Sequence, residues 1–378
     1  MTAPEPRRVL IATITLTAGT GTAVYTRDLA LALLRRGHLP IVYASETGPI
    51  AEELRRATVP VVTDLDAVAG PPDVIHGHHQ FETLAALTRF PRVPVLFVCH
   101  DGLTWHSIPP VGPRIGLYVA VDRNCRDRMV FEHGIPEHLI HVLTNAVDLL
   151  RFSRRSPLPP KPRRALVFSN SAEEEAWVKP IRAACEGRGI ALEIGGAAAG
   201  RPLDRPEEVL VQYDLVFAKA RCAIEALAAG CAVIVCDAQG LAGLVTASSL
   251  EALRQLNFGA RTLRRTITAA NVEAEIDRYD SADAAAVCDA IRRSAEVDLL
   301  VDQYASLYEE LCAQPPAEGD EMLAVSRSLS RMAAQLYAHV GTEKPATAPP
   351  PPPSLPLSVP SARPSVLRRV VRRLRKLL

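Results

Sequence analysis

Residues 214–245 combine cationic, acidic and glycine residues in a pattern that could hold a phosphate. A strand-like apolar run meets a turn that carries Lys219 and Arg221, and an apolar helix follows with a single carboxylate, Glu225. Helix N-termini attract anions because backbone amides and the helix dipole point at them. A carboxylate about one turn further along could accept hydrogen bonds from a ribose. The pattern predicts a phosphate and ribose site; the alternative is a βαβ unit whose cations are merely solvated.

Glu225 and His100 each have a functional and a structural interpretation. Glu225 lies on an otherwise apolar helix face, where an unpaired carboxylate is costly to bury. We expect a ribose to satisfy it, with a structural ion pair as the alternative. His100 ends an apolar run and precedes Asp101, at the sheet edge where open α/β proteins bind ligands. A histidine with a purely structural role is the alternative there.

The close spacing of His76, His78 and His79 suggests a zinc site at first sight. Adjacent strand residues face opposite ways, so only His76 and His78 could share a face. No cysteine or carboxylate lies nearby in the sequence to complete a ligand set. We therefore expect no metal. A polar and aromatic turn, Asn257-Phe258-Gly259 followed by Arg261, has no mechanism that the sequence suggests.

The elements that must position these residues follow an alternating pattern. Short apolar runs bounded by turn residues are typical of buried parallel strands and alternate with helical or loop material. Such runs lie at 8–13, 41–45, 59–65, 73–78, 93–101 and 117–122. The proline- and arginine-rich segment 153–164 predicts a linker. The strand and helix alternation then restarts at 165–170, so we expect an α/β fold with two Rossmann-like domains.

Composition narrows the class of protein. A length of 378 residues is typical of two domains, and a net charge of +1 gives no overall preference for nucleic acid. Eight cysteines without a C-x-x-C pair favour a reducing compartment. No apolar run approaches about 20 residues, and the N-terminus has no signal-peptide pattern. We expect a cytoplasmic protein.

The C-terminal region, residues 342–378, differs in composition from the two predicted domains. Residues 342–363 are rich in proline and predict an extended spacer. Residues 364–378 predict an amphipathic helix with one apolar and one strongly basic face, which suits the surface of an anionic membrane. We expect it to bind the inner face of the membrane; docking on a partner or on the protein's own acidic face is the alternative.

Several motifs, in this order along the chain, resemble the GT4 family, a group of retaining glycosyltransferases with the GT-B architecture. Gly19 and Gly21 match its glycine-rich loop, DVIHGHH at 73–79 its strand ending in H-x-H, and His100 the histidine that ends the next strand. LTNAVDLLRF at 143–152 resembles the segment before its interdomain linker. ALAAGCAVIVCD follows Glu225 as it follows the family's ribose-binding glutamate. The resemblance covers roughly 8–310.

The resemblance implies a metal-independent, hexosyltransferase-type enzyme that moves a sugar from a nucleotide-diphosphate sugar to a glycan or lipid-linked acceptor. No cofactor is implied beyond that co-substrate, and no nucleic acid. From the resemblance and the residue patterns together, we expect His100, Lys219 and Arg221 to be catalytic, and Gly19, Gly21, Asn170, Gly195, Lys219, Arg221 and Glu225 to bind the donor. The domains expected are 1–155 (acceptor), 156–315 (donor), 316–341 (a helical extension), 342–363 (linker) and 364–378 (basic helix).

The chain departs from the family pattern at two places. Phe217 stands where the family has a first glutamate that contacts the donor sugar. Asn170 and a run of acids stand where the family has an arginine and a lysine, so Lys219 and Arg221 are expected to supply the charge. The departures keep two alternatives open. One is a non-catalytic nucleotide-sugar sensor or scaffold, and the other is a GT-B sugar-nucleotide epimerase.

Overall fold

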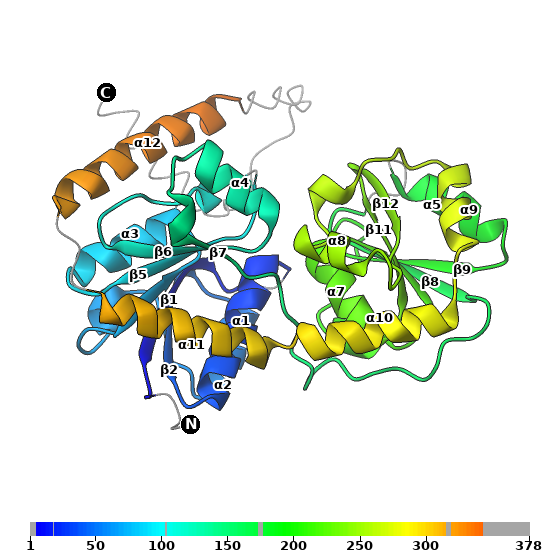
Figure 1. Ribbon diagram of the computed structural model, residues 1–378, viewed down its shortest axis with the longest axis horizontal. Coiled ribbons are helices and arrows are strands. Elements are labelled where there is room, and N and C mark those ends of the chain that lie inside the picture. Colours follow the sequence, from blue (N-terminus) through cyan, green and yellow to red (C-terminus); the bar gives the residue numbers. More distant parts are fainter. Residues whose placement is uncertain (1–4, 18, 103, 173–176, 315–318, 343–378) are drawn as a thin grey trace, which may run out of the picture. The chain divides into compact units, whose positions relative to one another are not determined.

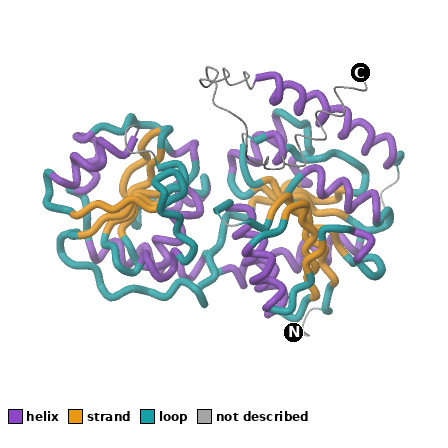
Figure 2. Tube along the Cα trace, turned by 180° about the vertical axis from the view of Figure 1, so that it is seen from behind, coloured by secondary structure: helices purple, strands orange, loops and turns teal. Residues whose placement is uncertain are grey.

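A computed structural model of the chain describes residues 5–17, 19–102, 104–172, 177–314 and 319–342. Within the compact unit that ends at Met332, two separate sheets each lie between layers of helices (Figures 1 and 2). The expected fold class, two Rossmann-like α/β domains, is confirmed. The predicted proline-rich linker and basic helix, 343–378 among them, lie outside the described residues.

The first domain has a seven-stranded, all-parallel sheet in the order β3-β2-β1-β4-β5-β6-β7, with strand order reversing beside β1. This is the order of a doubly wound nucleotide-binding fold, in which ligands bind at the carboxyl ends of the strands. Strand β3 is only two residues long, shorter than the expected strand at 59–65. The strands are β1 Arg8–Thr15, β2 Leu39–Glu46, β3 Val61–Val62, β4 Val74–Gly77, β5 Val95–Cys99, β6 Ile115–Ala120 and β7 Ile140–Val142; the helices between them are α1 Gly21–Arg35, α2 Pro49–Arg56, α3 Gln80–Arg89 and α4 Arg123–Phe131.

The second domain has a five-stranded sheet in the order β12-β11-β10-β8-β9. Its strands are parallel except for β12, which pairs with β11 as an antiparallel hairpin. The strands are β8 Arg164–Phe168, β9 Ala191–Gly195, β10 Leu215–Ala218, β11 Ala232–Asp237 and β12 Gly240–Leu244; the helices are α5 Lys179–Glu186, α6 Pro206–Leu210, α7 Ala220–Ala229, α8 Leu250–Gln255, α9 Ala269–Ile276 and α10 Ser281–Ser294.

Helix α11 (Val297–Ala313) differs from its predicted place in the domain 156–315. Its buried face, which includes Leu300, Val301, Tyr304 and Tyr308, belongs to the hydrophobic core of the first domain. The chain thus crosses back after α10, and α11 covers the first sheet (Figure 1). An amphipathic helix must bury its apolar face against another apolar surface. For α11 that surface is provided by the first domain, beside α1.

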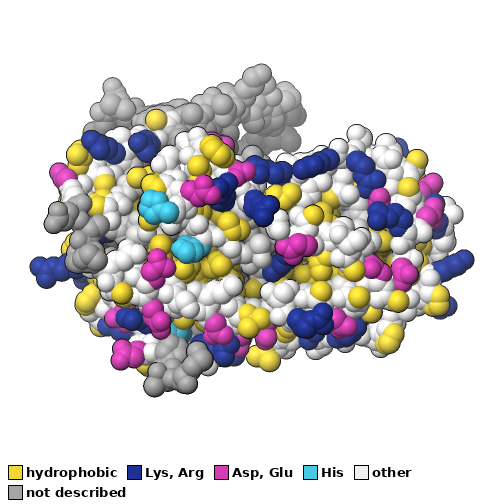
Figure 3. Space-filling model, viewed as in Figure 1, with side chains coloured by type: hydrophobic (Ala, Val, Ile, Leu, Met, Phe, Trp, Pro, Cys, Tyr) yellow, Lys and Arg dark blue, Asp and Glu magenta, His cyan; other side chains and the backbone are white. Residues whose placement is uncertain are grey.

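Helix α12 (Glu321–Thr342) lies within the predicted helical extension 316–341 apart from its last residue. None of the helices in the described ranges combines the length and the apolar composition that a bilayer crossing needs. On the face in Figure 3, basic and acidic side chains are interspersed and do not form a patch of one sign. That distribution agrees with the net charge of +1.

Candidate functional site

A cavity of about 490 Å³ lies at the carboxyl ends of strands from both sheets. The first domain contributes the loop after β1, and the second contributes residues that follow β8, β9 and β10. This is the sheet edge at which open α/β folds bind ligands. The cavity brings together five of the predicted site residues: Gly19, Gly21, Asn170, Arg221 and Glu225.

The glycine loop is open and is tied to the second domain. Gly19 has φ +91°, a conformation that favours glycine, and its carbonyl accepts a hydrogen bond of 2.7 Å from Asn170 Nδ2. Gly21 begins α1, and a Cβ atom there would meet nothing within 4 Å. Neither positive φ nor crowding therefore requires glycine at position 21. A residue without a side chain at the mouth of a cavity leaves room for a ligand to approach the backbone.

At the start of α7, Arg221 holds two buried carboxylates. Its Nε donates to Glu225 Oε1 at 2.8 Å, and its Nη2 pairs with Asp28 Oδ2 on α1. Burial raises the pKa of Glu225 to about 7, and the nearby Arg221 opposes that rise. The carboxylate that we expected a ribose to satisfy is thus satisfied by an ion pair in this structure, while Glu225 still lines the cavity.

Lys219 is not where we expected it. Its Nζ pairs with Asp237, the last residue of β11, and it does not line the cavity. Lys219 lies at the N-cap of α7 and Arg221 inside the helix, and their side chains pair with different carboxylates, Asp237 and Asp28. The structure therefore corrects the prediction that Lys219 and Arg221 form one cationic clamp.

Asn170 and Gly195 shape the wall of the cavity formed by the second domain. Asn170 Oδ1 accepts from the amide of Ala197 at 3.3 Å, which fixes the side chain that also binds Gly19. Gly195 does not line the cavity, but a Cβ there would lie 2.6 Å from the Leu203 side chain, which does. Gly195 thus acts by leaving space for Leu203.

Phe217 lies in β10 and is completely buried in the core on one face of the second sheet. Its side chain is absent from the lining of the cavity. At this position the chain has an apolar core residue, so any contact to a donor sugar must come from other side chains.

His100 lies in a buried cluster of histidines and tyrosines of the first domain and not in the cavity lining. His100 Nε2 and His78 Nδ1 are 2.7 Å apart, and the rings of His76 and His78 have centroids 4.8 Å apart. His76 Nδ1 is 2.6 Å from the Tyr308 hydroxyl on α11. Burial lowers the pKa of His100 to about 4, so its imidazole is neutral at pH 7. In the described ranges, no group of three or more His, Cys, Asp or Glu is arranged to hold a metal ion.

Three charged residues beside the cavity, Arg27, Asp28 and Arg151, were not predicted from the sequence. Asp28 is buried, pairs with Arg27 at 2.7 Å and lies 3.6 Å from Arg151. Arg27 and Arg151 line the cavity. The sequence does contain a feature that indicates Arg27 and Asp28, because these two charged residues interrupt the apolar pattern of the helix after the glycine loop. Buried charged residues of this kind need partners.

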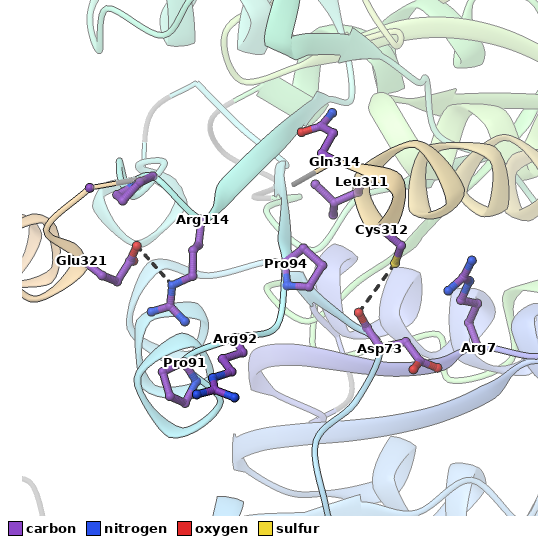
Figure 4. Close-up of a pocket in the computed structure, with 12 residues that line it drawn as sticks. Arg7, Asp73, Pro91, Arg92, Pro94, Arg114, Leu311, Cys312, Gln314 and Glu321 are labelled. Atoms are coloured by element: carbon purple, nitrogen blue, oxygen red, sulfur yellow. Dashed lines mark hydrogen bonds and ion pairs between the residues drawn. The ribbon is translucent and has the colours of Figure 1, made fainter. Parts of the chain in front are cut away.

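A second cavity, of about 650 Å³, lies at the opposite ends of the strands of the first sheet (Figure 4). Its lining includes residues that immediately precede strands, such as Arg7 before β1 and Asp73 before β4. Arg114 pairs with Glu321 across it at 3.1 Å. We do not assign a donor to it, because the amino ends of parallel strands are not where this fold class binds ligands.

Comparison with solved structures identifies the fold. A glycosyltransferase from Rickettsia africae matches 82% of this chain and all of its own length, with a TM-score of 0.59 and 12% identity. Anabaena Alr3699/HepE, crystallised with UDP and glucose, matches 80% of this chain and all of its own, with a TM-score of 0.53 and 15% identity. The S. aureus MnaA–UDP structure matches 83% of this chain and all of its own, with a TM-score of 0.50 and 13% identity. A search of curated protein sequences finds no match.

A comparison with protein-family models also matches a glycosyltransferase family, over most of the first domain. Residues 19–151 match the model described as Glycosyltransferase Family 4. The matched region begins at the glycine loop and ends at Arg151, so it contains every first-domain residue that lines the cavity. The family match and the two-domain fold together confirm the resemblance of this chain to GT4-like glycosyltransferases of GT-B fold.

Proposed function

We propose that the chain is a retaining, metal-independent glycosyltransferase whose donor, a nucleotide-diphosphate sugar, binds in the 490 Å³ cavity. One observation carries the proposal: the glycine loop of the first domain, with Gly19 and Gly21, and the start of α7, with Arg221 and Glu225, line the same cavity. Uridine diphosphate is the first nucleotide to test, because HepE and MnaA, two proteins of this fold, were each crystallised with UDP.

The donor would lie with its ribose at Glu225 and its diphosphate at the start of α7. Helix amides and Arg221 would then face the phosphate oxygens that gain charge as the sugar leaves. The reaction joins an acceptor hydroxyl oxygen to the anomeric carbon and breaks the bond from that carbon to the phosphate oxygen. The acceptor proton leaves with the departing diphosphate. His100, neutral and partly buried, would support the acceptor side through His78.

For the donor to bind in this way, the Arg221 ion pairs must adjust. Arg221 is satisfied by Asp28 and Glu225 in this structure, so a phosphate would have to share or replace one of these carboxylates. Arg27 and Arg151 can take over Asp28, since both already pair with it. The network thus offers a route by which Arg221 turns to the donor without leaving Asp28 unpaired.

The experiment is incubation of the full chain with UDP-glucose, UDP-N-acetylglucosamine and GDP-mannose, with released nucleoside diphosphate as the signal. We expect release from at least one, and a loss of UDP affinity of at least about tenfold in Glu225→Gln, which removes a charged hydrogen-bond acceptor. Glu251→Gln, on the exposed α8, is the matched control. Binding without release would favour a sensor, for which Phe217 is the supporting observation, and sugar interconversion without release would favour an epimerase.

We propose further that residues 364–378, outside the described ranges, hold the enzyme on an anionic membrane surface at the cytoplasmic side. Their sequence supports this, with six basic residues opposite an apolar stripe, listed in order as Arg368, Arg369, Arg372, Arg373, Arg375 and Lys376. A lipid-linked or envelope-glycan acceptor, as in polysaccharide biosynthesis, would suit that location.

A further inference from the structure

The turn at Asn257-Phe258 has an unusual backbone. Four residues other than glycine have positive φ in the described ranges: Thr58, Ala220, Asn257 and Phe258. Asn257 and Phe258 are consecutive, with φ of +51° and +52°, and both are buried. Asparagine tolerates this conformation, but for a bulky residue such as phenylalanine it is a true outlier. Strain of this kind persists only where the surrounding contacts hold it, and it clusters at functional sites.

One contact of the turn is the start of α7. The amide of Ala220, which also has positive φ and is the first residue of the helix, donates to the carbonyl of Phe258 at 3.0 Å. Lys219, the N-cap of α7, gives no side-chain hydrogen bond to the helix. The strained turn therefore fixes the entry of the helix whose next residue is Arg221, and leaves the following amides free of a side-chain cap.

Its other contacts are with the segment that follows β7 and with α4 of the first domain. Asn257 Oδ1 accepts from the backbone amide of Asn145 at 3.3 Å. Arg261 Nη1 pairs with Asp127 Oδ2 of α4 at 2.5 Å. A Cβ at Gly259 would lie 3.5 Å from Asp122 Oδ2, so the turn also abuts the N-cap of α4. One short segment thus links α4 and the segment that follows β7 to the start of α7.

We propose that residues 257–261 form a strut that sets the start of α7 against the first domain, and that Asn257 is a positioning residue for transfer. It acts through the α7 amides and Arg221, so this inference rests on the proposed function. The strut matters most when charge develops on the departing diphosphate, because electrostatic stabilisation depends on donors held in place before the reaction. Ground-state binding through the ribose depends on it less.

The test compares Asn257→Gly, which keeps the left-handed conformation and removes the acceptor oxygen, with Asn257→Asp, which keeps both. We expect Asn257→Gly to lower kcat for nucleoside diphosphate release about tenfold, as expected for one lost positioning hydrogen bond, with the Kd for UDP within about threefold of wild type. Asn257→Asp should keep kcat within about threefold. Thr58→Gly changes the fourth left-handed residue, which is exposed and lies after α2, and serves as the control.

Hydrogen exchange of the amides 220–223 gives a readout that needs no turnover. Asn257→Gly should speed their exchange, and Thr58→Gly should not. Unchanged exchange and kcat in Asn257→Gly, or an equal loss of kcat in Asn257→Asp, would overturn the strut. If the wild-type chain releases no nucleoside diphosphate and binds no UDP, the proposed function fails, and exchange alone then decides whether the strut exists.

Discussion

Arg221 and Asp28 form a buried ion pair although 193 positions separate them in the sequence. The pair joins α7 of the second domain to α1 of the first, and Glu225 completes it on the same helix. The residue that the sequence predicts as a phosphate ligand is therefore also one of the residues that join the two α/β domains at the cavity, as Asn170 does through Gly19. In the proposed donor complex, the phosphate and the contact between the domains would share one guanidinium, that of Arg221.

Asp28→Asn should lower the free energy of unfolding by about 3 kcal/mol, because it leaves a buried guanidinium short of a charged partner. Urea denaturation followed by circular dichroism measures this. Asp289→Asn is the matched control, since Asp289 pairs with Arg154 at 2.5 Å with both side chains nearly half exposed. That change should cost less than about 1 kcal/mol. Equal losses for the two variants would contradict the importance of the buried pair.

The raised pKa of Glu225 makes stability depend on pH in a definite direction. Its pKa is about 7 in the folded chain and near 4.5 in the unfolded chain, so the folded state binds the proton more tightly. This contribution to stability is complete below pH 4.5 and is lost as the pH rises to about 7, by up to roughly 3 kcal/mol. Glu225→Gln removes it. The difference in unfolding free energy between wild type and variant should therefore change between pH 5 and pH 8, and a constant difference would contradict the raised pKa.

Much of the fold could be predicted because local patterns specify it. Buried parallel strands are apolar on both faces, so the runs at β1, β5, β6 and β11 stand out without any long-range information. Gly230 closes α7 with φ +91°, in the left-handed conformation for which glycine is the usual residue at a helix end. At the site, Gly19 and Asn170 could be placed near each other only through the family resemblance, since 151 positions separate them.

The parts that could not be predicted depend on pairings across the chain. Strand β12 has the sequence GLAGL, without β-branched or aromatic residues, and it exists because β11 offers an unpaired edge. Helix α11 follows the second domain in sequence and joins the core of the first. Likewise, nothing near Lys219 in sequence reveals that Asp237 will neutralise it. In all three cases the partner is determined by tertiary contacts, and the local sequence pattern does not distinguish that partner from the alternatives.

The histidine cluster should make the protein sensitive to acid. Burial lowers the pKa of His76 and His79 to about 3 and that of His100 to about 4. Below pH 6.5 the unfolded chain binds protons that the folded chain does not, so stability falls as the pH drops from 6.5 towards 4. Each of these histidines contributes about 1.4 kcal/mol per pH unit within that window. His79→Gln should reduce the slope of unfolding free energy against pH between 4.5 and 6. An unchanged slope would show that His79 is protonated in the folded state.

Gly21→Ala separates a role in folding from a role in binding. Space for a Cβ exists at this position, and alanine favours helix, so the melting temperature should stay the same or rise slightly. If the donor approaches the backbone there, the added methyl group should weaken UDP binding severalfold, as measured by calorimetry. Gly77→Ala provides the contrast, because a Cβ there would lie 2.1 Å from Thr83 Oγ1 in the core and should lower the melting temperature. Wild-type affinity in Gly21→Ala would argue against close backbone contact with the donor.

The basic tail can be tested in the full-length chain by replacing its six arginine and lysine residues with glutamine, which keeps the length and the apolar stripe. In flotation with vesicles of phosphatidylglycerol and phosphatidylcholine, the wild-type chain should float and the variant should not, because each basic residue near an anionic surface contributes about 1 kcal/mol. Vesicles of phosphatidylcholine alone, or 0.5 M salt, should release the wild type as well, since both remove the electrostatic attraction. Flotation of wild type and variant alike would mean that other residues, or the apolar stripe alone, bind the membrane. Absence of flotation in the wild type would favour docking of the tail on protein.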